Sequence, residues 1–105
     1  MAGQGAVTEE TLPALRREID AVDARLVGLL AERFRIVERV VAVKKRDRLP
    51  ANIPERVEEV VEAARRLAEA EGLPADLAET LWRAMVAWTI EHEEKQLSQA
   101  GGTAS

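Results

Sequence analysis

The feature that most constrains the fold is a single helical pattern that runs from about Glu9 to about Arg46. Its apolar residues recur at steps of three and four, which is the spacing of one helix face. They are Leu12, Leu15, Ile19, Val22, Leu26, Leu29, Ile36, Val40 and Val43. A helix of this length spans roughly 54 Å, whereas a compact domain of about 100 residues has a radius of gyration of only about 13 Å. Two shorter helices cannot cover such a stripe, so we expect a second copy of the chain to cover it.

Two shorter helical patterns follow, separated by proline and glycine signals. The segment DRLPANIP ends the first pattern, and Pro54 suits the first position of a second helix. Gly72 suits the C-cap of that helix, and Pro74 begins a third helix that we expect to end near Ser98. No strand pattern of period two occurs. The sequence therefore predicts an all-α fold, a three-helix chain with one very long first helix that forms an intertwined homodimer.

Composition and chain ends limit the class of protein. We expect one helical domain over residues 11–98, between a disordered N-terminus (1–10) and a disordered tail (99–105), because both ends are small and polar. The 105 residues include no cysteine and carry a net charge of −4, which excludes disulfides and disfavours general nucleic-acid binding. No apolar run approaches the roughly 18–20 residues of a membrane span, and the N-terminus lacks the order of a signal peptide. We therefore expect a cytoplasmic protein with no membrane partner.

Two cations interrupt the apolar stripe of the first helix. Arg33 takes a position where the spacing predicts an apolar residue, and Lys44 follows eleven residues later. Eleven residues are about three turns, so the two side chains point nearly the same way. Two further arginines, Arg16 and Arg56, lie beside apolar stripes. Long basic side chains near a stripe often reach water, so the set carries more weight than any one member.

The third helix places polar residues on an apolar stripe in the same way. Trp82, Val86, Thr89 and Glu93 follow one another at spacings of four, three and four. Thr89 is able to bond to a carbonyl of its own helix, and a glutamate near the chain end is able to reach water. Several cations in one helical interior are costly unless paired, and only Asp23 and Glu93 offer acids on these stripes. We infer a pocket for a small, partly apolar molecule with carboxylates, since an arginine binds a carboxylate with two bonds.

Other kinds of chemistry find little support in the sequence. There is no His/Cys cluster with the spacing of metal ligands, no glycine-rich phosphate loop and no Ser/His/Asp set. His92 has no ligand-like neighbours and receives no role. Glu91, Glu93 and Glu94 fit a solvated face better than a metal site. We therefore expect neither a metal nor a cofactor.

The stretch LPALRREIDAVDARLVGLLAERF, a lysine at the end of the same helix, then PERV and a third helix resemble the all-helical chorismate mutase family, from about Leu12 to about Leu97. The resemblance implies a dimer of three-helix chains in which the first helix crosses to the other subunit. It implies a chorismate mutase, an isomerase that converts chorismate to prephenate for aromatic amino acid biosynthesis, without a cofactor.

The resemblance also implies roles for individual residues by position. Arg16 of the partner chain and Arg33 would each hold one carboxylate of the substrate. Lys44 would face the ether oxygen of the breaking bond. Glu93, in its protonated form, would be the second partner of that oxygen, at a position where the family usually has glutamine.

Two residues at the second helix and two at the third bear on the substrate. Arg56 matches the arginine that follows the linker, and Thr89 matches a small hydroxyl residue near a substrate carboxylate. Val57 departs from the mutases, which commonly have a glutamate there to receive the ring hydroxyl of the substrate. The related isochorismate-pyruvate lyases also read PERV, and they tend to have an aromatic residue where this chain has Trp88. The substrate is therefore open among chorismate, isochorismate and a 4-amino-4-deoxy analogue.

Two alternatives belong to other classes. One is a non-enzymatic helical dimerisation module, in which the long helix is a partner-binding surface and its cations are exposed. The other is a nucleic-acid binder, which would use the basic residues Arg33, Arg35, Arg39, Lys44, Lys45, Arg46 and Arg48. These seven point all round the helix in an acidic chain, so no single basic face results.

Overall fold

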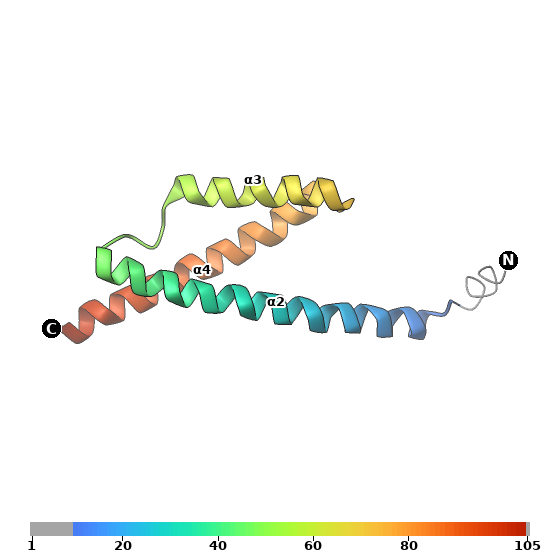
Figure 1. Ribbon diagram of the computed structural model, residues 1–105, viewed down its shortest axis with the longest axis horizontal. Coiled ribbons are helices and arrows are strands. Elements are labelled where there is room, and N and C mark those ends of the chain that lie inside the picture. Colours follow the sequence, from blue (N-terminus) through green and yellow to red (C-terminus); the bar gives the residue numbers. More distant parts are fainter. Residues whose placement is uncertain (1–9, 105) are drawn as a thin grey trace. The chain divides into compact units, whose positions relative to one another are not determined.

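The computed structural model describes residues 10–104, with side chains through Gln99. Within this range the chain forms three α-helices and no strand: α2 (Leu12–Asp47), α3 (Pro54–Glu71) and α4 (Ala75–Ala104), as Figure 1 shows. The predicted all-α fold with a very long first helix is confirmed. None of the helices in the described range is long and apolar enough to cross a membrane.

The chain ends differ in part from the prediction. Helix α4 continues to Ala104, past the predicted end near Ser98; no proline stops it there, although Gly101 and Gly102 disfavour a helix. The predicted disordered N-terminus (1–10) falls outside the described residues, apart from Glu10.

Capping interactions explain where the helices begin and end. Thr11 caps α2, since the backbone N–H of Ala14 donates to its hydroxyl oxygen at 3.3 Å. Helix α3 begins at the predicted proline and ends before Gly72, whose φ of 76° lies in the left-handed region. The N–H of Leu73 then donates to the carbonyl of Ala68 at 2.8 Å, which is the bond of a Schellman C-cap. The predicted C-cap at Gly72 is confirmed.

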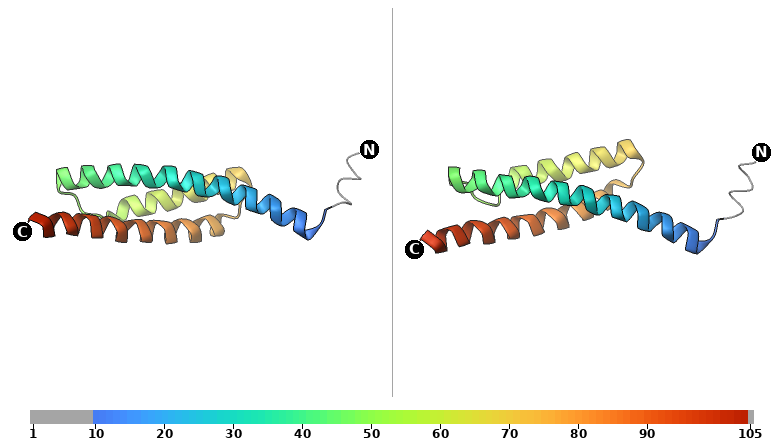
Figure 2. Two further views of the ribbon diagram at one scale, coloured as in Figure 1. Left: turned by 90° about the horizontal axis from the view of Figure 1, so that it is seen from below. Right: turned by 60° about the horizontal axis from the view of Figure 1, so that its bottom comes forward.

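The chain consists of two compact units, Met1–Ile36 and Val37–Ser105. In the second unit α3 and α4 pack against each other and run in opposite directions, joined by the short turn at residues 72–74 (Figures 1 and 2). The last turns of α2 belong to the same unit and contact α4 through side chains, as described below. This unit is therefore a helical hairpin with the end of α2 attached to its second helix.

Small side chains form the core of the second unit. The buried apolar residues are Val41, Ala51, Val61, Ala64, Ala68, Ala78 and Val86. Val61 is the largest fully buried side chain among the described residues. Because hydrophobic stabilisation scales with the apolar area removed from water, a core of alanines and valines gives the single chain little of it.

The first unit leaves its apolar stripe in contact with water. Its exposed large apolar residues are Leu12, Ile19, Val22, Leu26, Val27, Leu29, Leu30, Phe34 and Ile36. Exposure in this set reaches 64% at Val27. A contiguous apolar surface of this kind marks an interaction site in soluble proteins.

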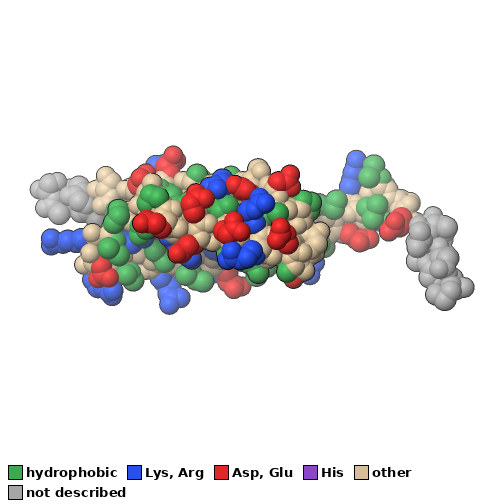
Figure 3. All heavy atoms as spheres, turned by 90° about the horizontal axis from the view of Figure 1, so that it is seen from above, with side chains coloured by type: hydrophobic (Ala, Val, Ile, Leu, Met, Phe, Trp, Pro, Cys, Tyr) green, Lys and Arg blue, Asp and Glu red, His purple; other side chains and the backbone are tan. Residues whose placement is uncertain are grey.

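Ion pairs connect α3 to α4 at the surface. Figure 3 shows acidic and basic side chains interspersed over the face that carries α3. Arg83 lies 3.0 Å from Glu58 and 2.7 Å from Glu79, and Arg65 lies 2.7 Å from Glu79. Hydrogen bonds from Arg83 lower the pKa of both Glu58 and Glu79, and they raise the pKa of Arg83 itself. Exposed pairs of this kind contribute modestly to stability, and the lowered pKa values place this contribution at neutral rather than acidic pH.

Candidate active site

A lysine and a glutamate from different helices form a largely buried pair in the second unit. The Nζ atom of Lys44, near the end of α2, lies 2.7 Å from Oε1 of Glu93 on α4. The two side chains are only 13% and 7% exposed. Among the described residues, Glu93 is the only polar one in the buried core. Burying two charges is costly even when they pair, so the pair calls for an explanation other than stability.

The end of α2 holds Lys44 in place. Arg48 adopts a left-handed conformation with φ 58°, and Leu49 donates its N–H to the carbonyl of Lys44 at 2.9 Å. This turn brings the chain back, so that Nζ of Lys44 donates to the carbonyl of Ala51 at 2.9 Å. An ammonium group has three N–H donors. Glu93 and Ala51 take two of them, and no other acceptor within the described residues takes the third, which leaves one donor for a ligand.

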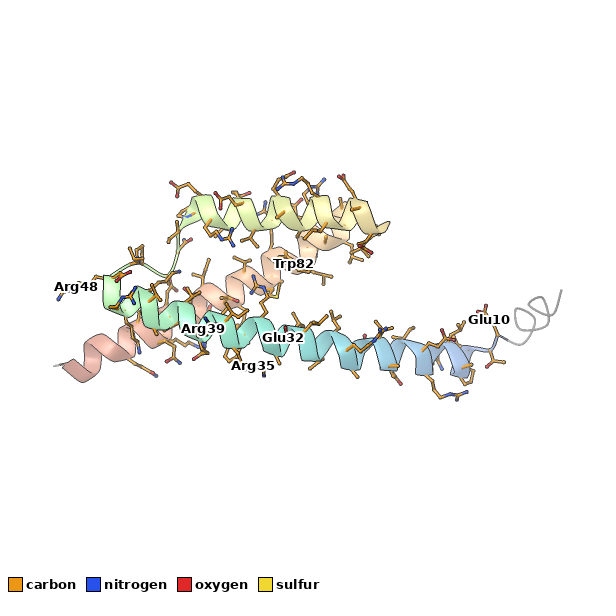
Figure 4. All side chains as sticks on the ribbon, in the orientation of Figure 1. Glu10, Glu32, Arg35, Arg39, Arg48 and Trp82 are labelled. Carbon is orange, nitrogen blue, oxygen red and sulfur yellow. The ribbon has the colours of Figure 1, made fainter. Side chains whose placement is uncertain are left out.

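The polar stripe of α4 continues one turn before Glu93. The hydroxyl of Thr89 donates to the carbonyl of Met85 at 2.9 Å, which is the bond within the helix that the sequence allowed. Trp82 extends the same stripe and lies half-buried on α4, where Figure 4 labels it. Thr89 is also half-buried, so its oxygen is partly accessible to a ligand.

Arg16 and Arg33 belong to the first unit, at the positions on α2 where the sequence places them. Arg33 is half-buried and Arg16 is exposed. Within residues 10–99, no carboxylate lies within ion-pair distance of either guanidinium. A half-buried arginine with no carboxylate partner among the described residues is suited to an anionic ligand.

Arg56 and Val57, at the start of α3, lie outside the Lys44 contact. Arg56 is exposed and pairs with Glu59 on its own helix at 3.3 Å. Val57 is half-buried and lines a pocket of about 280 Å³ in the second unit. The other lining residues are Asn52, Pro54, Glu58, Arg83, Val86, Ala87 and Ile90. The apolar part of this wall comes from both α3 and α4.

A second link between α2 and α4 was not predicted from the sequence. Nε2 of His92 lies 2.5 Å from Oε2 of Glu38. The imidazole also stacks on the indole of Trp88, with ring centroids 5.2 Å apart and planes 8° from parallel. The one signal in the sequence was the position of His92 directly before Glu93. Among the described residues, no group of three or more His, Cys, Asp and Glu side chains is arranged to hold a metal ion.

The basic residues of the long helix do not gather on one surface. Arg46 pairs with its neighbour Asp47 at 2.8 Å, and Lys44 is turned inward to Glu93. In Figure 4, the side chain of Arg48 projects beyond the end of α2, and that of Arg39 projects from the side of the helix. This arrangement gives no support to the nucleic-acid alternative.

The second unit is thus an all-helical scaffold that holds a buried, ligand-ready ammonium group beside a carboxylate, the kind of site that receives a small polar molecule. The sequence model of the family described as Chorismate mutase type II matches residues 15–94, which is more than half of the chain. The chain belongs to this family, and the resemblance inferred from its motifs is confirmed.

Similar proteins in this family carry several names. The chain is 41% identical over 85 residues to the T-protein of Enterobacter agglomerans, covering 79% of this chain and 23% of that protein. It is 28% identical over 96 residues to the 4-amino-4-deoxychorismate mutase of Streptomyces pristinaespiralis, covering 91% of this chain and 74% of that enzyme. It is 26% identical over 85 residues to the chorismate mutase of Methanocaldococcus jannaschii, covering 81% of this chain and 82% of that enzyme. The chain spans 23% of the length of the T-proteins of Enterobacter agglomerans and Haemophilus influenzae.

Proposed function

We propose that this chain is a chorismate mutase, an isomerase that rearranges chorismate to prephenate for aromatic amino acid biosynthesis. Family membership supports the proposal, and the buried Lys44–Glu93 pair is the observation that carries it. The reaction is pericyclic, so it needs no nucleophile, metal or cofactor. The site has to hold a folded dicarboxylate and stabilise the charge that develops as one bond breaks.

Lys44 is the proposed donor to the breaking bond. As the C–O bond of the substrate stretches, negative charge develops on the ether oxygen. The remaining N–H of Lys44 would donate to that oxygen from a group already fixed by Ala51. Such a preorganised donor stabilises the transition state without reorganising during the reaction.

Glu93 is the proposed second partner of the same oxygen. An ionised carboxylate only accepts hydrogen bonds, whereas a protonated one also donates. The ionised form also partly neutralises the positive charge of Lys44, with which it is in contact. A protonated Glu93 therefore favours the reaction.

In this proposal the remaining polar residues bind the two carboxylates of the substrate. Arg33 would hold one substrate carboxylate, and Arg16 of a second copy would hold the other, each through the two-bond geometry that guanidinium allows. Arg56 and Thr89 would complete the binding of the substrate. To donate to a carboxylate, the hydroxyl of Thr89 has to rotate away from the carbonyl of Met85.

A homodimer is part of the proposal, because the apolar stripe of the first unit is exposed in the single chain. The second unit also exposes apolar residues around and near its α3–α4 turn, namely Leu67, Leu73, Leu77 and Leu81. A second copy brings the same surfaces, which suits a symmetric dimer. Leu26→Glu on the stripe should shift sedimentation toward the monomer. As the control, Arg25→Glu adds an acid on the same turn but outside the stripe, so it should leave the dimer intact. A wild type that is monomeric at micromolar concentration would refute the proposed homodimer.

Val57 bears on which substrate the site takes. Val57 is apolar, so it is unable to accept a hydrogen bond from a ring hydroxyl. The relatives named 4-amino-4-deoxychorismate mutase and, in Methanocaldococcus jannaschii, chorismate mutase are 28% and 26% identical to this chain. Isochorismate-pyruvate lyase activity is the second candidate, and Val57 is the observation that favours it. A cytoplasmic location stays part of the proposal.

One assay separates these substrates. Chorismate, isochorismate and 4-amino-4-deoxychorismate are supplied separately, and the products are followed as prephenate, its amino analogue, pyruvate and salicylate. We expect prephenate from chorismate, with little product from the other two. Lys44→Met serves as the control for turnover at this site. If no substrate is turned over and none raises the melting temperature, the chain is a helical dimerisation module.

A further inference from the structure

Two side-chain contacts join the end of α2 to α4 in the second unit. Glu38, Val41 and Lys44 recur every three residues, so they lie on one side of α2. Val41 is buried, while Glu38 contacts His92 and Lys44 contacts Glu93. His92 and Glu93 are consecutive, so their side chains leave α4 about 100° apart. The two links therefore hold α4 from two directions.

His92 is itself fixed from two directions. Trp88, one turn earlier on the same helix, stacks on the imidazole and sets the plane of the ring. Glu38 contacts Nε2 and sets the direction in which the ring points. The His92 side chain is only 17% exposed. A side chain held in this way transmits the position of α2 to the backbone of α4.

Rotation of α4 is the motion that this second link would restrain. Packing against α3 limits large rotations of α4, but the single contact of Lys44 with Glu93 does not fix small rotations of α4 against the end of α2. A rotation of about 10° moves a group that lies about 6 Å from the axis by about 1 Å. A misplacement of about 1 Å is enough to cost about 10²-fold in rate when the group takes part in the reaction.

We propose that Glu38 and His92 are positioning residues that fix the rotation of α4 against the end of α2 and so hold the carboxylate of Glu93 on Lys44. The catalytic consequence rests on the proposed mutase function, whereas the geometric consequence does not. The ion pair between Arg65 and Glu79 offers a matched comparison. It also joins α4 to another helix, at 2.7 Å, but Glu79 lies fourteen residues before Glu93, which is about 21 Å along the helix.

The first test measures, without substrate, whether the ammonium group of Lys44 keeps its hydrogen bonds. The side-chain ammonium signal of Lys44 is recorded by ¹⁵N-edited NMR and assigned by its loss in Lys44→Met. In the wild type we expect a resolved signal, because hydrogen bonds to Glu93 and Ala51 slow proton exchange. Glu38→Ala and His92→Leu should broaden or remove it. Arg65→Ala should leave it unchanged.

The second test uses kinetics and conservative variants. Glu38→Ala and His92→Leu should each lower kcat by about 10- to 100-fold with KM changed by less than about threefold. His92→Gln keeps an N–H donor near the place of Nε2, and it should recover kcat to within about threefold of wild type. The double variant should be no slower than either single variant, because both act through one contact. If Glu38→Ala does not fold, Glu38→Met, which keeps the length of the side chain but has no oxygen to contact His92, takes its place beside His92→Leu.

The outcomes separate this inference from the proposed function. An unchanged Lys44 signal and unchanged kcat in both Glu38→Ala and His92→Leu would overturn the positioning role. Additive losses in the double variant would also overturn it. A wild type without mutase activity, whose Lys44 signal still depends on Glu38 and His92, would refute the proposed function and support the positioning role.

Discussion

Lys44 and Glu93 lie 49 residues apart in the sequence, yet the ammonium of one is 2.7 Å from the carboxylate of the other. The carbonyl of Ala51 takes a second N–H of Lys44 at 2.9 Å. The ammonium group is thus oriented by the protein before any ligand arrives. A buried charge fixed in advance is a poor source of stability and an effective means of stabilising charge that develops in a reaction.

The first prediction concerns the two functions of this pair. Lys44→Met should lower kcat/KM by about 10²–10³, and it should also destabilise the fold by about 3–5 kcal/mol because Glu93 is left buried without a partner. The double variant Lys44→Met/Glu93→Leu should recover most of the stability, since no unpaired charge remains, but none of the activity. Chemical denaturation and steady-state kinetics of the three proteins test this. A fully active Lys44→Met would remove the lysine from the reaction.

The second prediction concerns the proton on Glu93. If Glu93 faces the ether oxygen, its ionised form repels the developing charge and its protonated form donates to it. The kcat/KM of the wild type should therefore fall as the pH rises. Glu93→Gln keeps a donor at every pH, so its profile should be flatter, with higher activity than the wild type at alkaline pH. Profiles of the same shape would show that Glu93 does not act at the reacting oxygen.

Parts of the fold and site follow from local sequence patterns. The three helices and the C-cap at Gly72 depend on spacing and on neighbouring residues, so they were predictable. Lys44 and Glu93 were predictable as candidates because each places a charge where the spacing predicts an apolar side chain. The structure adds that they contact each other.

Other features depend on how distant elements meet, and the sequence patterns do not contain that. The contact of Glu38 with His92 requires the rotation of α4 against α2, which no local periodicity specifies. Arg48 adopts a left-handed conformation where glycine or asparagine is usual, so no cap signal marked the end of α2. The continuation of α4 beyond Ser98 was also missed, since GGTA resembles a loop by composition.

The third prediction concerns the left-handed residue at the end of α2. A side chain with a Cβ in this conformation costs roughly 1–2 kcal/mol, and Arg48 is exposed, so its side chain has little packing to lose. Arg48→Gly should therefore raise the free energy of unfolding by about 1 kcal/mol, after the added freedom of glycine in the unfolded chain is subtracted.

Gly72 provides the matched control for Arg48. Its φ is 76°, and an added Cβ would meet no atom within 4 Å. Gly72→Ala should thus lower the free energy of unfolding by about 1 kcal/mol for backbone reasons alone. Denaturant unfolding of both variants compares the two ends directly. Loss of stability in Arg48→Gly would mean that the side chain contributes more than its exposure indicates.

The fourth prediction concerns acid stability. Hydrogen bonds from Arg83 hold the pKa values of Glu58 and Glu79 below their ordinary value of 4.5. A carboxylate with a lowered folded pKa contributes stability above its unfolded pKa, and this stability is lost as the pH falls through the folded pKa. Arg83→Gln should therefore melt below the wild type at neutral pH. The gap should narrow below pH 4.5 and close once both carboxylates are protonated in the folded wild type.

A second surface arginine serves as the control for Arg83. Arg66 and Glu62 both lie on α3 and pair at 3.7 Å. Arg66→Gln should therefore change the melting temperature little, both at neutral pH and in acid. Thermal melts of the three proteins over a pH series give the comparison. A gap between Arg83→Gln and the wild type that persists unchanged in acid would mean that Arg83 stabilises the fold by packing rather than by charge.

The last prediction tests whether one site draws on two chains. In the proposed dimer, each site uses Arg33 of one chain and Arg16 of the other, so Arg16→Ala and Arg33→Ala should each be nearly inactive. When the two variants are unfolded together and refolded, about half of the dimers are mixed, and each mixed dimer has one site with both arginines. The mixture should recover about a quarter of the wild-type activity. Arg33→Ala refolded with Lys44→Met is the control, because both residues belong to one chain and no complete site results. Absence of recovery in the first mixture, with mixed dimers detected by mass, would show that Arg16 does not act across the interface.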